Sequence, residues 1–468
     1  MKLSPLSLSF IPLLSATAFS ANAAPQAHVV CAYHHTLGDD AIMMFGKPNQ
    51  AMWHDFFGNT HTDAVSTYRT LRAQPETTCD NKADSSAYWA PTMKLPDGQI
   101  VTPAYQKTYY YQATKVDQYP LHPFPAGLEL LAGDHHGSAP SARISFLCAN
   151  GKGYTNKAGE VCGLRKGGDA VQFNIGIQFP NCWDGVNLKP GHGHSNATYD
   201  VNGACPAEFP VKIPTVNMNI AWVLPQITSL DTAKIQLSMD PVMHDGVREE
   251  HWGSIYTAHA DFMNGWTVEG ARYMTDHCMN QGIDCGTQVP YGYSTLTENA
   301  VVSSTEPDTR HPSPENLLIS DNWQNGGRAH NPETLTLVKF AIPPLPKNQD
   351  TSLFKYKLRL YGGKVESNGA DQIFFYPASN DWNADSVTWN HRPACNYKSD
   401  TQLYLNASRE YRMVDVDKAV RKALAEGKTE ISWYIGGDRQ GNHYQFEPAS
   451  TNQEPILMLT GFKSTPQV

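Results

Sequence analysis

The sequence lacks most of the short signatures that identify common enzyme classes. It has no glycine-rich phosphate loop and no G-x-S-x-G elbow, which argues against nucleotide chemistry and against a lipase-type mechanism. None of its nine cysteines forms a C-x-x-C pair, so a zinc–thiolate site is not expected. Charged residues make up 17% of the chain and the net charge is −9, whereas a nucleic-acid groove needs a basic stripe.

Long apolar runs are missing beyond the first residues. These combine Lys2, an apolar stretch from Leu6 to Phe19 and the A-x-A site Ala21-Asn22-Ala23, which is the pattern of a secretory signal peptide over residues 1–23. No later segment reaches about 18 consecutive apolar residues, so no membrane anchor is expected. We therefore predict a secreted, extracellular protein that starts near Ala24, and we expect a monomer.

Eight of the cysteines should pair in an oxidising compartment. Spacing alone does not decide the connectivity, but short loops favour pairing in order along the chain. On that basis Cys395 is left over. The predicted disulfides are Cys31–Cys79, Cys148–Cys162, Cys182–Cys205 and Cys278–Cys285.

The length of 468 residues predicts two or three domains. The composition changes near residue 290, where the paired cysteines end and a Ser/Thr/Asn/Pro-rich stretch begins. We predict a domain over 24–288, a linker and domain entry over 289–314, and a second domain over 298–462.

Short runs of β-forming residues bounded by Gly, Pro or Asn predict a mostly β fold in both domains. The first domain is expected to be β-sandwich-like with two helices, Asp63–Ala73 and Asn264–Gln281, and the second a jelly-roll β-sandwich with one helix, Asp415–Ala425. The predicted strands of the first domain are Ala142–Cys148, Ala170–Phe179, Val216–Leu224 and Lys234–Met239. Those of the second are Leu335–Ile342, Tyr356–Tyr361, Gln372–Tyr376, Glu430–Ile435 and Pro455–Thr460.

Three histidine-centred clusters in the first domain are candidates for chemistry, because ionisable groups among aromatics shift their pKa values in ways that catalysis uses. Each also has a structural interpretation: a helix entry, a polar surface loop stapled by Cys182–Cys205, and a helix cap at Asp261 or Asn264. The first cluster is Trp53-His54-Asp55, followed by Arg69; the second is Trp183-Asp184 with His192, His194 and Tyr199; the third is His259, Asp261, Asn264 and Trp266.

Other clusters are weaker. Asp134-His135-His136 is interpreted as a surface turn, because nothing beside it indicates a pocket. In the second domain Tyr376, Trp382 and Trp389 could stack on sugar rings, although core packing is the better interpretation of Trp389. Asp381 and Asp385 could bind a structural calcium. We expect no other cofactor, and no metal in the site itself.

Several motifs of the first domain occur in the order typical of domain-of-unknown-function family 1996, which they resemble over about residues 28–285. They are His54 to Asn59, Ser86-Ala87-Tyr88-Trp89, Cys182 to Gly185, His194 to Tyr199, and His259 to Phe262 with Asn264-Gly265-Trp266. The resemblance implies a secreted protein and says little about activity.

The second domain resembles a DNRLRE-type carbohydrate-binding module over about residues 298–462. The matching segments are Val338-Lys339-Phe340, Leu358 to Tyr361, Ser386 to Asn390, Val414-Asp415-Val416 and Glu454 to Leu457. Because modules of this kind accompany polysaccharide-degrading domains, the resemblance implies an extracellular polysaccharide as the partner.

The preferred hypothesis is a lyase that cleaves an acidic, uronate-containing polysaccharide by β-elimination. His194 or His259 would be the base and Tyr199 the acid, while Asn264, His54 and Arg69 would hold the uronate carboxylate. The remaining predicted substrate contacts are Trp53, Tyr88, Trp183, Asp184 and Trp266.

Two alternatives stay open. A glycoside hydrolase would use a pair of aspartates among Asp55, Asp184 and Asp261. A non-catalytic cell-wall-binding protein would line a groove with the same clusters. All three hypotheses assume that the clusters meet in space.

Overall fold

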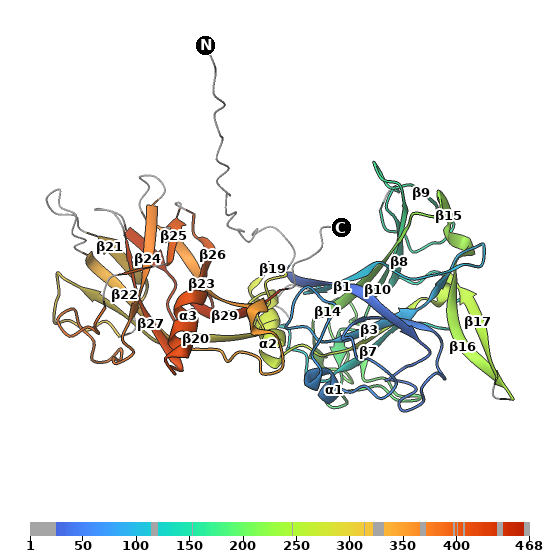
Figure 1. Ribbon diagram of the computed structural model, residues 1–468, viewed down its shortest axis with the longest axis horizontal. Coiled ribbons are helices and arrows are strands. Elements are labelled where there is room, and N and C mark those ends of the chain that lie inside the picture. Colours follow the sequence, from blue (N-terminus) through green and yellow to red (C-terminus); the bar gives the residue numbers. More distant parts are fainter. Residues whose placement is uncertain are drawn as a thin grey trace, which may run out of the picture. The chain divides into compact units, whose positions relative to one another are not determined.

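The computed structural model describes residues 25–113, 120–151, 153–245, 247–312, 314–321, 332–365, 371–395, 398–399, 401–405, 408–437 and 443–462 (Figure 1). The predicted signal peptide, residues 1–23, and Ala24 lie outside the described residues. Strands hold 45% of the residues and helices 9%, which confirms the predicted mostly β fold. Within the described part of the chain, no helix is long and apolar enough to cross a membrane.

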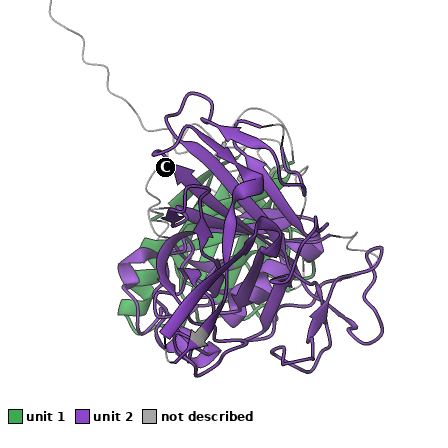
Figure 2. Cartoon of the chain, turned by 90° about the vertical axis from the view of Figure 1, so that its right-hand side faces the viewer, with its two compact units in different colours: residues 1–19, 295–340, 357–456 green, residues 20–294, 341–356, 457–468 purple. Residues whose placement is uncertain are grey.

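The described residues form two units (Figure 2). The N-terminal unit holds the described residues up to 294 together with 341–356 and 457–462, and the C-terminal unit holds those of 295–340 and 357–456. The stretch predicted as a linker contains strand β20 (Gly292–Ser303), which pairs with β22 (Pro332–Ala341). Its Ser and Thr residues resemble those of a linker, but buried Ala300 and Val302 give it a core face.

The N-terminal unit is built on one antiparallel sheet path, β7-β18-β3-β2-β1-β6-β14-β10-β8, with β19 added in parallel to β1. The strands of this path are β1 Gln26–Leu37, β2 His54–Gly58, β3 Ala87–Pro91, β6 Tyr105–Tyr111, β7 Glu129–Gly133, β8 Ile144–Cys148, β10 Val171–Gln178, β14 Thr215–Leu224, β18 His259–Met263 and β19 Asp284–Gly286. Smaller strands around it are β4 Met93–Lys94, β5 Ile100–Val101, β9 Val161–Gly163, β11 Cys182–Trp183, β12 Ala197–Thr198, β13 Val211–Lys212, β15 Ser229–Asp231, β16 Gln236–His244 and β17 Val247–Ser254.

Strand β1 belongs to both halves of this path. Its first part pairs with β6 and its last part with β2, and the register shifts between Tyr33 and His35. Such a bulge bends a strand. The two halves pack face to face, because the ring of Phe262 of β18 contacts those of Tyr110 of β6 and of Phe179 after β10, at centroid distances of 6.4 and 6.3 Å. This arrangement confirms the expected sandwich-like fold.

The outer face of the β2–β3–β18 half is also covered. Phe56, Trp89 and Met263 point to this side and pack against Ala41 and Ile42 of the segment that follows β1, and Leu71 of α1 packs on the same cluster. All five residues of β2 and all five of β3 are buried. The candidate site lies on this covered outer face.

The helices are shorter than predicted, and in α1 and α2 a threonine side chain caps the first turn later than the residue pattern indicates. Helix α1 spans only Tyr68–Ala73, since Thr67 forms a capping box. Helix α2 spans Val268–Asp276 after the N-cap Thr267, and α3 spans Asp417–Ala425. Four 3₁₀ turns complete the list: η1 Thr232–Lys234, η2 Ile255–Thr257, η3 Met279–Gln281 and η4 Thr351–Leu353.

The C-terminal unit is a second antiparallel sheet, with β23-β28-β21-β22-β27-β24-β25 in order and β26 beside β23. Its buried cluster includes Ala300, Leu337 and Tyr434, and Trp389 packs against that cluster. The further strands are β21 Leu317–Asp321, β23 Phe354–Lys364, β24 Asp371–Ala378, β25 Thr401–Leu405, β26 Glu410–Asp415, β27 Glu430–Gly437 and β28 His443–Phe446. Strand β29, Ile456–Gly461, belongs to the N-terminal unit from residue 457 onward.

The four predicted disulfides are all confirmed. They are Cys31–Cys79, Cys148–Cys162, Cys182–Cys205 and Cys278–Cys285. All lie in the N-terminal unit, where they connect segments close in sequence.

Candidate functional site

His54, His259 and Asp261 come together on the outer face of the N-terminal sheet. His54 is the first residue of β2 and His259 the first of β18, and both strands pair with β3. His259 and Asp261 alternate along β18, so their side chains share a face. One nitrogen of each imidazole and one carboxylate oxygen all lie within 4.8 Å of one another. The first and third predicted clusters therefore converge.

Both imidazoles are held by backbone carbonyls. Nδ1 of His54 lies 2.9 Å from the carbonyl oxygen of Asp39, and Nδ1 of His259 lies 2.9 Å from that of Thr257. Since a carbonyl only accepts, each Nδ1 carries the proton and each Nε2 keeps its lone pair. Nε2 of His54 is buried without a hydrogen-bond partner. Burial lowers the pKa of both histidines to about 4, so both are neutral.

Carboxyl groups surround the two histidines. Burial raises the pKa of Asp261 well above its usual value, and the nearby Asp40 and Glu129 raise it further. Burial raises the pKa of Glu129 to about 7, which Lys189 partly opposes, and Oε2 of Glu129 has no hydrogen-bond partner. Asp40 accepts hydrogen bonds from the amides of Ile42 and Met43. The surroundings of His54 and His259 are therefore rich in carboxyl oxygens that can accept hydrogen bonds.

Asp55 lies apart from this group, because neighbouring residues of a strand point to opposite faces. Its Oδ1 accepts hydrogen bonds from Thr36 at 2.6 Å and from Thr92 at 2.9 Å. Burial raises the pKa of Asp55 to about 7. The hydrogen bonds from Thr36 and Thr92 hold this carboxyl in the protein interior.

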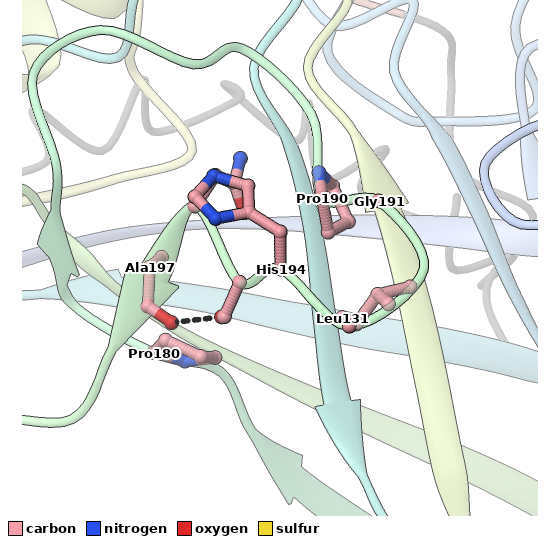
Figure 3. A pocket seen from close by; sticks show the side chains of 9 residues that line it. Leu131, Pro180, Pro190, Gly191, His194 and Ala197 are labelled. Carbon is pink, nitrogen blue, oxygen red and sulfur yellow. Dashed lines mark hydrogen bonds between the residues drawn. The ribbon is translucent and has the colours of Figure 1, made fainter.

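The second predicted cluster lies in an exposed loop. Nε2 of His194 is 3.9 Å from Oδ2 of Asp184, whose Oδ1 accepts the amides of Val186 and Asn187. The Trp183 indole donates to the carbonyl oxygen of Asn187. His194 borders a pocket of about 370 Å³ with Leu131, Pro180, Pro190 and Ala197, and Ser195 closes the loop by bonding to Ala197 (Figure 3).

Tyr199 borders a different pocket, of about 360 Å³, which it shares with Arg143, Tyr256 and His136. The Arg143 guanidinium carbon lies 4.3 Å from the centre of the Tyr199 ring. The Tyr199 hydroxyl donates to the carbonyl oxygen of Gln178, and burial raises its pKa to about 12. The Tyr256 hydroxyl accepts from the amide of Ala158 and so keeps its own proton to donate.

This second pocket adjoins the histidine group through Gly133. Gly133 lines the pocket and pairs with His259 across β7 and β18. A Cβ at Gly133 would lie 2.6 Å from Cα of His259 and 2.3 Å from the carbonyl oxygen of Ala258, so the two strands approach more closely than a side chain permits. The exposed turn at His135 is beside it as well, with its ring 6.0 Å from that of His259.

Three predicted substrate contacts lie in the interior instead. The Trp266 indole donates to the Tyr110 hydroxyl, which bonds to the Tyr88 hydroxyl, and Tyr88 donates to Asp84 at 2.6 Å. Asn264 donates to the carbonyl oxygen of Pro125. Tyr88, Asn264 and Trp266 are at most 1% exposed, so a polymer cannot reach them in this conformation. Sequence patterns reveal aromatic and amide groups but not which face they occupy.

The remaining two predicted substrate contacts, Trp53 and Arg69, are not fully buried. Trp53 is half-buried, and its amide donates to the Ser238 hydroxyl. Arg69 is exposed on α1. Four further residues near the site were not predicted from the sequence: Asp40, Glu129, Arg143 and Tyr256. No local motif marks these residues, since the packing of segments distant in sequence brings them to the site.

A polar and aromatic face occupies the open side of the β1–β6–β14–β10–β8 half. Tyr109, Tyr111, Tyr154, Asn217 and Asn219 border a third pocket of about 420 Å³ there. The Y-x-Y alternation of β6 puts these tyrosines on one side and buried Tyr110 on the other. Rings flanked by amides can contact both the apolar faces and the hydroxyls of sugars.

Comparison with known proteins divides the chain in the same order as the predicted domains. A search of curated proteins finds no match. Residues 40–266 match the family model described as a domain of unknown function, DUF1996, and residues 290–461 match carbohydrate-binding module family 96. The DNRLRE-type label is not confirmed by the second match. The chain thus joins a region similar to a domain of unknown function to a region similar to a carbohydrate-binding module, and the second match supports an interaction with carbohydrate.

Proposed function

We propose that the protein is a secreted polysaccharide lyase that binds a uronate-containing polymer through its C-terminal module and cleaves it in the N-terminal unit. One observation carries the reaction type: Arg143, two tyrosines and His136 share a pocket whose wall at Gly133 pairs with His259. The four disulfides and the binding module are consistent with an extracellular protein. Export through residues 1–23 is part of the proposal.

β-Elimination at a uronate requires three groups. A cation or hydrogen-bond donor neutralises the carboxylate, a base removes the C5 proton, and an acid protonates the leaving oxygen. A guanidinium matches a carboxylate with two parallel hydrogen bonds, so Arg143 is the proposed carboxylate partner. His136 is the proposed base, and Tyr256, whose hydroxyl accepts from the amide of Ala158 and keeps its own proton, is the proposed acid.

This assignment differs from the expectation from sequence in each role. Arg143 takes the carboxylate in place of Asn264, His54 and Arg69, and the expected acid Tyr199 already donates its hydroxyl to Gln178.

The base also differs. Nδ1 of His259 is engaged by a backbone carbonyl and its other nitrogen belongs to the buried His54–Asp261 group. His194 borders another pocket. His136 is preferred because it borders the same pocket as Arg143.

A hydrolase is less well supported. It needs two carboxylates about 5–10 Å apart across the scissile bond. Asp55 is engaged by two interior threonines, and Asp184 is engaged by amides of its own loop. None of Asp55, Asp184 and Asp261 borders the pocket of Arg143.

The test is a screen of purified protein against alginate, pectin, hyaluronan, glucuronan, chitosan and β-glucans. Absorbance near 235 nm reports an unsaturated uronate, and a reducing-end assay reports any cleavage. We expect both signals to rise on a uronate polymer. We expect Arg143→Gln to lower kcat/KM by roughly 10- to 100-fold, because a charge-assisted hydrogen bond is lost.

Arg69→Gln is the matched control, since Arg69 is exposed on α1 and should leave the rate unchanged. New reducing ends without the absorbance would indicate hydrolysis and contradict the lyase. Binding without either signal would indicate a non-catalytic binding protein. Equal losses in both variants would contradict the role of Arg143.

A further inference from the structure

We propose that His54, His259 and Asp261 form a binding site for a divalent transition-metal ion of the zinc class. Their three ligand atoms lie within 4.8 Å of one another, which allows all three to contact one ion after small side-chain movements. They come from β2 and β18, which are both anchored to β3. Ligands on paired strands are held more rigidly than ligands on loops.

The hydrogen bonds of the two imidazoles match those of metal ligands. A metal-binding histidine usually donates its other ring N–H to a carbonyl or carboxylate, which fixes the tautomer and the ring orientation. Here Asp39 and Thr257 supply such carbonyl oxygens, each 2.9 Å from Nδ1. Both Nε2 atoms are left for the ion.

The unpartnered atoms in the group need an explanation. His54 is 1% exposed, and among the described residues its Nε2 has no hydrogen-bond partner, nor has the buried Oε2 of nearby Glu129. A buried polar atom without a partner destabilises the folded state, because it has lost its hydrogen bonds to water. An ion bound by the His54 nitrogen removes that cost and gives the atom a function.

The charge of the surroundings also favours a cation. Asp40 and Glu129 act electrostatically on Asp261, so three carboxyl groups are grouped in the protein interior beside two neutral histidines. A divalent ion balances such a concentration of carboxyl groups. Asp40 and Glu129 are in place to stabilise the ion and its ligands.

The ligand types select the metal class. Calcium and magnesium take oxygen ligands almost exclusively, whereas two imidazoles and one carboxylate suit zinc and similar ions. Three protein ligands leave a coordination position free, as in catalytic rather than structural zinc sites. His259 is half-buried and pairs with Gly133 of the Arg143 pocket, so that pocket is the approach for a substrate oxygen.

A bound metal would act as a Lewis acid toward a carboxylate or sugar oxygen in that pocket. This role rests on the proposed function, whereas metal binding itself does not. Metal binding and polymer cleavage are therefore measured separately.

Full-length protein is stripped with a chelator and titrated with Zn²⁺ and with Ca²⁺ by calorimetry, and the bound metal is counted by elemental analysis. We expect one equivalent of Zn²⁺, with an affinity at least 100-fold above that for Ca²⁺, and a higher melting temperature with the metal. His259→Ala and Asp261→Asn should each weaken Zn²⁺ binding roughly 100-fold. His135→Ala is the control, because its exposed ring lies 6.0 Å from His259 and outside the ligand set.

Folding of every variant is checked by circular dichroism, and His259→Gln replaces the alanine variant if the latter is unfolded. Failure of the folded protein to take up one Zn²⁺, equal binding of Ca²⁺, or uptake unchanged in folded variants would overturn the site. Zinc binding without polymer cleavage would leave the site standing and refute the lyase. Cleavage that survives complete metal removal would refute the catalytic role of the ion.

Discussion

At the scale of single residues, the Asp84 carboxyl is the most informative group in the interior. It accepts hydrogen bonds from the amide of Ser86 and from the Tyr88 hydroxyl, at the end of a chain that runs from Trp266 through Tyr110. Burial nevertheless raises its pKa from 3.8 to about 6, because the two donors do not replace the lost hydration. The folded state therefore holds this proton more tightly than the unfolded state.

A pH dependence of stability follows. The Asp84 contribution is fully present below pH 4 and is lost as the pH rises to about 6, which amounts to about 3 kcal/mol of unfolding free energy. We expect Asp84→Asn to flatten the fall in unfolding free energy over this window, measured by urea denaturation at a series of pH values. Asp97→Asn on the surface is the control. Parallel pH profiles of the wild type and Asp84→Asn would contradict the prediction.

At the scale of elements, the loop that carries His194 and Tyr199 has little regular structure of its own. Strand β11 pairs with β12 and β13 over two residues each. The disulfide Cys182–Cys205 closes this loop, with a sequence separation of 23. The geometry of the loop therefore depends on a covalent link rather than on an extended ladder.

Removing this link should affect the loop specifically. We expect the double variant Cys182→Ala and Cys205→Ala to lose about 3 kcal/mol of unfolding free energy, since the unfolded chain gains freedom. Amides within 183–204 should exchange hydrogen faster, as measured by mass spectrometry. The variant Cys148→Ala with Cys162→Ala should lose a similar free energy without faster exchange in 183–204. Unchanged exchange in the first variant would show that the short strands suffice.

At the scale of the whole molecule, the N-terminal unit is not continuous in sequence. It includes residues 341–356 and 457–462. The amide of Lys82 donates to the carbonyl oxygen of Gly461 at 2.8 Å, and the amide of Tyr291 to that of Leu459 at 2.7 Å. The Tyr273 hydroxyl donates to the sulfur of Met458 at 3.6 Å. The end of the chain thus completes the first unit.

A chain truncated to residues 24–289 lacks these segments. It should therefore be less stable than the N-terminal unit of the full-length chain. Losing these hydrogen bonds and the apolar contacts around them should lower the melting temperature of the N-terminal transition by roughly 5–10 °C. Differential scanning calorimetry of the truncated and full-length chains measures this shift. Deletion of 463–468 alone is the control. Equal melting temperatures for the truncated and full-length chains would mean that the unit is complete at residue 289.

Structural features that depend on residues close in sequence could be predicted, whereas features that depend on distant segments could not. The mostly β class, the strands near Ile144–Cys148 and Val171–Gln178, and the four disulfides could all be predicted, because alternation and short loops are local properties. Helix boundaries were less predictable. Thr67 and Thr267 both start their helices later than the residue pattern indicates, since their side chains cap the first amides.

The sequence by itself determined which residue types could support chemistry and the order of the two domains. Tertiary structure alone decided which of them meet. The pairing of β2, β3 and β18 joins His54 to Asp261, and the alternation of side chains then puts Asp55 on the opposite face. Tyr88 and Trp266 resemble substrate contacts in sequence, yet packing of the two sheet halves buries them. Burial and proximity arise from contacts between distant segments, and no local pattern encodes such contacts.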